Sequence, residues 1–181
     1  MATLRLETGK AHTEINTVNH HLKALQVQVE PLPLHTYLVT PEIRRLLQHL
    51  FSQDILNLTQ KQEILQALGP KYAPPQHVGV CSSCELMVVS LSSPNLYQFM
   101  AQGSRPRCYT ADQVFYVLSG ECIFGFSLPN GLQLELMLQA QECIKVPAGV
   151  RHWFSLSTSL QVKAIRYLAG IPQKNKCYLC E

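Results

Sequence analysis

Short apolar runs separated by turn residues dominate the second half of the chain. Each run is either apolar throughout or alternates with polar positions, which is typical of strands that lie against a core. Ser119-Gly120 and Pro129-Asn130-Gly131 have the composition of hairpin turns. Evenly spaced short strands with such turns indicate an all-β barrel or jelly roll. The expected strands are Glu85–Ser92, Asp112–Leu118, Glu121–Phe126, Leu132–Leu138, Glu142–Val146, His152–Leu156 and Leu160–Leu168.

The first half of the chain has helical periods and fewer strand signals. Proline stands in the first turn of one expected helix, Thr13 caps another, and Gly69-Pro70 ends a third. We expect one mainly β domain over residues 1–181, with an N-terminal part (1–84) packed on a barrel (85–170) and a tail (171–181). The expected N-terminal elements are extended segments at Thr3–Glu7 and Val27–Pro33, and helices at Thr13–Leu25, Pro41–Phe51 and Thr59–Leu68; a further helical segment is expected at Pro94–Ala101.

Composition and charge exclude several classes of protein. Hydrophobic residues make up 46% of the chain and charged residues 15%, which is typical of a well-filled globular interior. The net charge of +3 is spread along the chain without a basic stripe, so a nucleic-acid surface is not expected. There is no apolar run of about eighteen residues and no signal-peptide core, so we expect a cytoplasmic protein without a membrane span.

Seven cysteines suit a reducing compartment better than a disulfide framework. Two C-x2-C pairs, Cys81/Cys84 and Cys177/Cys180, have the unit spacing of structural zinc sites. The gap between the pairs is much longer than the roughly 15 to 20 residues usual in such sites. A four-cysteine zinc site, a redox pair and ordinary thiols all remain open.

The chain resembles the acireductone dioxygenase family of cupins over most of its length. The resemblance rests on F-Y-V-L-S-G-E-C-I-F-G-F, on V-P-A-G-V-R-H-W-F and on V-K-A-I-R-Y. It implies a single cupin barrel of the jelly-roll type. It also implies an H-x-H-x3-E motif and a later histidine, which together hold Fe or Ni in that family.

The metal ligands implied by the resemblance are mostly replaced. When the motif is aligned on Val114 and Gly120, its three ligands fall on Arg107, Tyr109 and Gln113, while His152 retains the fourth position. Phe115 stands where the family usually has an arginine. A guanidinium cannot ligate a metal, and a glutamine is a weak donor. We therefore expect no metal cofactor, with Fe or Ni as the alternative.

A second reading brings Cys108 and Asp112 in as ligands beside His152. Strand alternation opposes it, because Cys108 then faces away from Arg107 and Tyr109.

The substituted residues form a coherent chemical set if the alternation holds. Arg107 offers a fork that matches a carboxylate, and His152 is suited to carry a proton. Tyr109 and Gln113 are suited to donate hydrogen bonds to an enolate oxygen. We expect His152 and Tyr109 to be catalytic and Arg107, Gln113 and Phe115 to bind substrate.

These residues predict a metal-free cupin that isomerises or tautomerises a small keto acid. The proton shift is expected to be allylic or similar, and prephenate-derived acids of specialised biosynthesis are one candidate class. Two alternatives stay open: a residual metal-dependent dioxygenase of the acireductone type, and a non-catalytic protein that binds a small molecule. The expected partners are a small carboxylate and a second copy of the chain, paired through an edge strand such as Thr3–Glu7.

Overall fold

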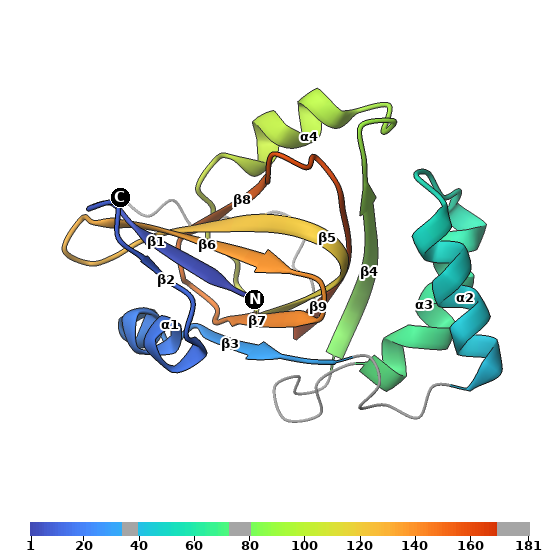
Figure 1. Cartoon of the computed structure of the whole chain (residues 1–181), viewed down its shortest axis with the longest axis horizontal. Helices are drawn as coiled ribbons and strands as arrows, with labels where there is room; N and C mark the ends of the chain where they lie inside the picture. The colour runs from blue at the N-terminus through green and yellow to red at the C-terminus, as the bar shows by residue number, and fades with distance from the viewer. Residues whose placement is uncertain (34–39, 73–80, 170–181) are drawn as a thin grey trace.

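The computed structural model describes residues 1–33, 40–72 and 81–169, and the fold is mainly β as the sequence predicts. In the described residues nine strands form one curled sheet, with helices around it (Figure 1). The elements in chain order are β1 (Thr3–Leu6), β2 (Ala11–His12), α1 (Ile15–Leu22), the 3-10 helix η1 (Lys23–Leu25), β3 (Gln28–Pro31), α2 (Pro41–Ser52), α3 (Leu58–Tyr72), β4 (Cys81–Val89), α4 (Leu96–Gly103), β5 (Gln113–Ser127), β6 (Gln133–Gln139), β7 (Glu142–Val146), β8 (His152–Leu156) and β9 (Val162–Ala169).

Strand β5 joins the two halves of the curled sheet. Its first part pairs with β7 and β9, and its second part pairs with β6 and β8. The predicted hairpin at Ser119-Gly120 is therefore wrong, because the chain continues as one strand through it. Gly120 has a φ of 78°, and a Cβ there would lie 2.2 Å from the carbonyl oxygen of Gln161. A glycine is needed at this point because the strand bends while a neighbouring backbone approaches closely.

The space between the two halves of the sheet holds the inner core. Alternate β5 residues such as Phe115 and Val117 point into it and meet Leu136 and Val162 from other strands. The predicted turn at Pro129-Asn130-Gly131 is confirmed, since β5 ends and β6 begins on either side of it. Apolar burial on this face is what closes the curled sheet upon itself.

The other face of one half of the sheet is covered by the helices α2 and α3. Figure 1 shows the two helices side by side next to β4. Val114, Tyr116 and Leu118 of β5 face this second core and pack with residues of both helices. Both faces of β5 are thus buried, which explains its nearly continuous apolar sequence.

Lys163 of β9 links this half of the sheet to α2. Its side chain is fully buried, and Nζ donates hydrogen bonds to the carbonyl oxygens of Leu50 (2.8 Å) and Phe51 (2.9 Å). These carbonyls belong to the last turn of α2, which has no intrahelical partners for them. The lysine therefore caps the helix and fixes it to the sheet.

The helix ends differ from the sequence predictions at two places. The residue before α1 is Glu14, and it makes no side-chain capping bond, so the predicted cap by Thr13 is wrong. Helix α3 continues through Gly69-Pro70 to Tyr72, so the predicted stop is also wrong. Asn57 and Gln60 cap the start of α3 reciprocally, each backbone N–H bonding the other's side-chain oxygen at 2.9 Å.

The N-terminal part is built into the sheet as well as packed on it. Strand β1 lies between β2 and β6, so the segment Thr3–Glu7 is not the edge strand that the sequence suggested, while a homodimer stays a prediction. The predicted boundary between residues 84 and 85 falls inside β4. The predicted tail at 171–181 lies outside the described residues. Among the described residues, no helix is long and apolar enough to cross a membrane.

Candidate active site

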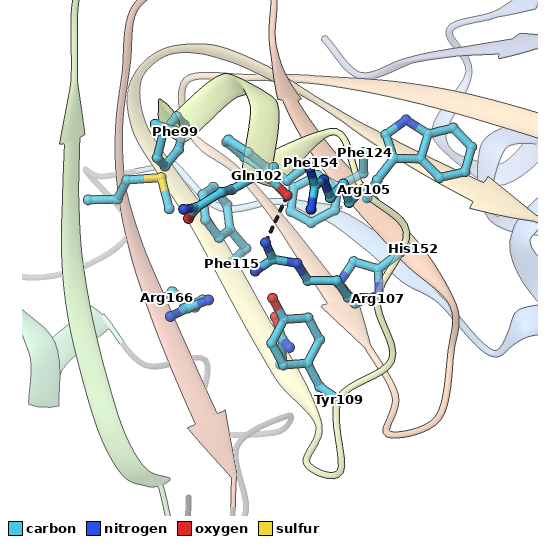
Figure 2. A pocket seen from close by; sticks show the side chains of 14 residues that line it. Phe99, Gln102, Arg105, Arg107, Tyr109, Phe115, Phe124, His152, Phe154 and Arg166 are labelled. Carbon is cyan, nitrogen blue, oxygen red and sulfur yellow. Dashed lines mark hydrogen bonds between the residues drawn. The ribbon is translucent and has the colours of Figure 1, made fainter. Parts of the chain in front are cut away.

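A cavity of about 130 Å³ opens between the two halves of the sheet, beneath α4 and the segment that follows it. It brings together all five residues that the sequence singles out, Arg107, Tyr109, Gln113, Phe115 and His152. Figure 2 shows the side chains of Arg107, Tyr109, Phe115 and His152 around one space. The remaining lining residues are Met87, Phe99, Gln102, Gly103, Arg105, Phe124, Trp153, Phe154 and Arg166.

A short backbone pairing places Arg107 beside His152. The two residues form an isolated antiparallel bridge, with N–H to carbonyl bonds of 2.8 Å and 2.9 Å in the two directions. Residues paired in this way project their side chains to the same side of the ladder. The guanidinium and the imidazole therefore enter the cavity from adjacent positions.

The surroundings of His152 select one tautomer and the neutral form. Its Nδ1 lies 2.9 Å from the carbonyl oxygen of Val150, so Nδ1 carries the proton and donates to that carbonyl, which leaves Nε2 as the acceptor. Burial lowers the pKa of His152 below its ordinary value, the bond to Val150 opposes this, and the charge of Arg166 adds to the lowering. Tyr109 lies against the imidazole, with 5.4 Å between ring centroids.

Gln113 begins strand β5 and stands in the wall of the cavity. Only 6% of the residue is exposed, and its Nε2 has no hydrogen-bond partner among the described residues. Buried amide groups in proteins normally have partners, so an orphaned donor facing a cavity indicates a missing acceptor. Phe115, two residues further along the same face, supplies an apolar surface at 4% exposure.

Helix α4 forms the roof of the cavity. Its Gly103 lies so close to β8 that a Cβ there would be 2.6 Å from the carbonyl oxygen of Phe154. Phe99 of the helix meets the Phe154 ring edge to face at 5.8 Å. The Nη2 of Arg107 donates to the carbonyl oxygen of Gln102 at 2.9 Å, which is the dashed line in Figure 2. The roof thereby holds the arginine in place.

Arg166 of β9 also lines the cavity, although the sequence did not single it out as a site residue. It lies in the V-K-A-I-R-Y segment, which the sequence marks only as part of a resemblance. Its Nη2 is 2.5 Å from Oε2 of Glu85, its cross-strand neighbour, and its Nε is buried without a partner in the described part of the chain. Arg105 adds a further guanidinium at the rim.

The alternative ligand pair, Cys108 and Asp112, is not arranged for a metal. Asp112 accepts a bond from the backbone N–H of Ala148 at 2.9 Å and pairs with Lys145 at 3.7 Å. Neither Cys108 nor Asp112 lines the cavity. Within residues 1–33, 40–72 and 81–169, no three His, Cys, Asp or Glu side chains gather to hold a metal ion. Cys177 and Cys180, the second of the two C-x2-C pairs, lie outside the described residues, so the choice among a zinc site, a redox pair and ordinary thiols stays open.

A curled jelly-roll sheet with a histidine-bearing cavity between its halves defines a protein of the cupin class. The family model described as "ARD/ARD' family" matches residues 11–175, and the chain belongs to this family. The acireductone dioxygenase of Trichodesmium erythraeum is 32% identical over 94% of this chain and 90% of its own. That of a Nostoc species is 35% identical with the same coverage.

The fold also matches a solved member of the family. The acireductone dioxygenase of Bacillus anthracis, described with a cadmium ion in its active center, is 25% identical to this chain, with a TM-score of 0.75 and 94% of each chain covered. The residues of this cavity do not fit such an ion well. The guanidinium of Arg107 has no lone pair to offer and repels a cation, and the unpaired group of Gln113 is an N–H donor. Only His152 is a good ligand.

Proposed function

We propose that the protein is a cupin isomerase or tautomerase that shifts a proton within a small keto acid without using a metal ion. The observation that supports this most strongly is the bridge between Arg107 and His152, which puts a carboxylate anchor beside a neutral base in one cavity. The guanidinium holds the anion and the neutral imidazole accepts the proton, and proton transfer on an anionic substrate needs both groups.

The residues divide the reaction between them. Arg107 binds the carboxylate of the keto acid through its guanidinium. The Nε2 of His152 removes a proton from the carbon next to the carbonyl, and the electron pair of that C–H bond moves to the carbonyl oxygen to give an enolate. Tyr109 and Gln113 donate hydrogen bonds to this oxygen as charge develops. His152 then returns the proton to a different carbon or to the enolate oxygen, so that no atom is gained or lost.

The apolar lining favours this chemistry. Phe124 and Phe126 approach the imidazole of His152 at 6.1 Å and 6.2 Å between ring centroids. These rings exclude water, which keeps the imidazole uncharged and strengthens the bonds to the enolate. The ring centroids of Phe115 and Phe154 are 5.4 Å apart, and the two rings offer a surface for the carbon skeleton of the substrate.

A metal-dependent dioxygenase acting on an acireductone is the second candidate. Family membership favours it, because relatives that carry that name match nearly the whole of their length. The substitutions at Arg107, Tyr109 and Gln113 disfavour it, since they leave one good ligand. Keto acids related to prephenate remain one candidate class of substrate under the first proposal.

Deuterium exchange distinguishes these functions. The full chain is incubated in D2O with a panel of short 2-keto acids and a chelator, and proton NMR follows the loss of the C3 signals. We expect catalysed exchange that falls at least about 100-fold in His152→Ala. Arg107→Ala should raise KM by about tenfold or more, since a charge-assisted anchor is lost. Arg151→Ala, an exposed arginine outside the cavity, should leave the rate unchanged.

Two other results would each replace the proposal. Oxygen uptake that requires added Fe²⁺ or Ni²⁺ and consumes an acireductone would establish the dioxygenase. Saturable binding of keto acids without exchange or oxygen uptake would instead establish a non-catalytic binding protein.

A further inference from the structure

Two buried hydrogen-bond donors of the cavity wall lack acceptors. They are the Nε2 of Gln113 and the Nε of Arg166, neither of which has a partner among the described residues. Leaving such groups unpaired in a buried position is unfavourable, and the penalty is larger for a charged group. Both residues line the same cavity, which indicates that a ligand supplies the missing acceptors.

Strand register brings these two donors together. Gln113 is opposite Leu168 across β5 and β9, and Phe115 is opposite Arg166. Gln113 and Arg166 are therefore diagonal neighbours on one face of the sheet, within reach of each other for long side chains. One carboxylate, with its two oxygens, suits a pair of N–H donors arranged in this way.

The charge of the cavity matches a ligand with two negative groups. Among the described residues, three guanidiniums line it, from Arg105, Arg107 and Arg166, and no carboxylate side chain does. Glu85 offsets one of them by its contact with Arg166, and the pKa of His152 is lowered toward the neutral form. Two positive charges remain for the ligand to balance. Figure 2 shows Arg107 and Arg166 entering this space from different sides.

We infer that Arg166 and Gln113 form a second anion site and that the substrate is a dicarboxylate keto acid. This inference rests on the proposed function, because it takes Arg107 as the anchor of the first carboxylate. The second carboxylate accepts from Arg166 Nε and from one N–H of Gln113, whose other N–H stays directed to the enolate oxygen. The carbon chain between the two acid groups lies against Phe115, which is opposite Arg166 in the same wall of the cavity.

Glu85 sets the orientation of Arg166 in this arrangement. Its carboxylate holds Nη2 from the direction of the edge strand β4 at 2.5 Å. The Nε side of the guanidinium is thereby left as the buried face. Arg166 is thus a residue that determines specificity, and the chemistry is left to His152.

Equilibrium binding of unreactive probes tests this inference. Succinate, glutarate and adipate are compared with the monocarboxylates butyrate, valerate and hexanoate at constant ionic strength. Trp153, the single tryptophan of the chain, lines the cavity and reports occupancy by its fluorescence. We expect the best dicarboxylate to bind at least about tenfold more tightly than its monocarboxylate match.

Four variants assign the preference to the proposed residues. Arg166→Met should abolish it by weakening dicarboxylate binding far more than monocarboxylate binding, and Gln113→Leu should reduce it. Glu85→Gln removes the ion pair but keeps an amide oxygen that can accept from Arg166 Nη2, so the orientation of the guanidinium and the preference should both survive. Arg151→Met removes an equal charge outside the cavity and should change nothing.

Equal affinity for the two classes of acid, or a preference that survives both Arg166→Met and Gln113→Leu, would overturn the inference. The proposed function fails independently of it. A dicarboxylate preference without any proton exchange would overturn the proposed function alone. Exchange on monocarboxylate keto acids without the preference would overturn this inference alone.

Discussion

His152 combines two properties that are set by different neighbours. The carbonyl of Val150 fixes the tautomer by accepting from Nδ1, and the aromatic rings and Arg166 keep the ring uncharged. A base must be neutral before it takes a proton, so the lowered pKa suits His152 to the role of base that we propose for it at neutral pH. In the proposed reaction Arg107, the partner of His152 in the β-bridge, supplies the attraction for the anion.

The same lowered pKa predicts how stability depends on pH. The folded pKa of His152 lies below the ordinary value of 6.5, so the unfolded chain binds more protons between the two values. The contribution of His152 to the free energy of unfolding is therefore fully present above pH 6.5, and it is lost as the pH drops through the folded pKa. Urea denaturation at about pH 7.5 and about pH 5 should show this loss in the native protein and a smaller one in His152→Gln.

The pKa of His21 is also lowered, so the comparison must be made between the native protein and the variant at each pH. An identical loss of stability in both would contradict the account of His152.

Among the elements, the contact between β9 and α2 has a clear energetic consequence. Lys163 satisfies two carbonyls at the end of α2 from a fully buried position. Lys163→Met should lower the free energy of unfolding by about 2 kcal/mol, because two charge-assisted hydrogen bonds are lost and the helix end is left unpaired. Denaturant unfolding of the full chain measures this change.

The control is Lys61→Met, the same substitution at a lysine of helix α3 that lies away from the contact with the sheet. It should change the free energy of unfolding little. Equal stability of Lys163→Met and the native protein would show that the cap is dispensable.

The strands illustrate what local sequence can and cannot predict. Glu142–Val146 and His152–Leu156 coincide with β7 and β8, because turn residues bound each run closely. Ser119-Gly120 has the composition of a turn, yet the chain uses this glycine for a bend inside β5. The difference depends on pairing with Gln161, far along the chain, which no local pattern contains.

For the whole molecule, the site lies where the two halves of the sheet meet under α4. The resemblance to the family's metal motifs, together with strand alternation, predicted that Arg107, Tyr109, Gln113 and His152 converge, and the cavity brings them together. Arg166 was not predicted, because its place in the wall follows from the pairing of β9 with β5. The second core, between the sheet and α2 and α3, holds this framework without entering the cavity.

We propose that this chain keeps the barrel of its family while anion binding has replaced metal ligation in the cavity. Calorimetric titration of Ni²⁺ tests it most directly, with a variant carrying Arg107→His, Tyr109→His and Gln113→Glu as the positive control. We predict that the variant binds about one Ni²⁺ per chain and that the native cavity binds none. Stoichiometric Ni²⁺ binding by the native protein that is lost in His152→Ala would contradict the account.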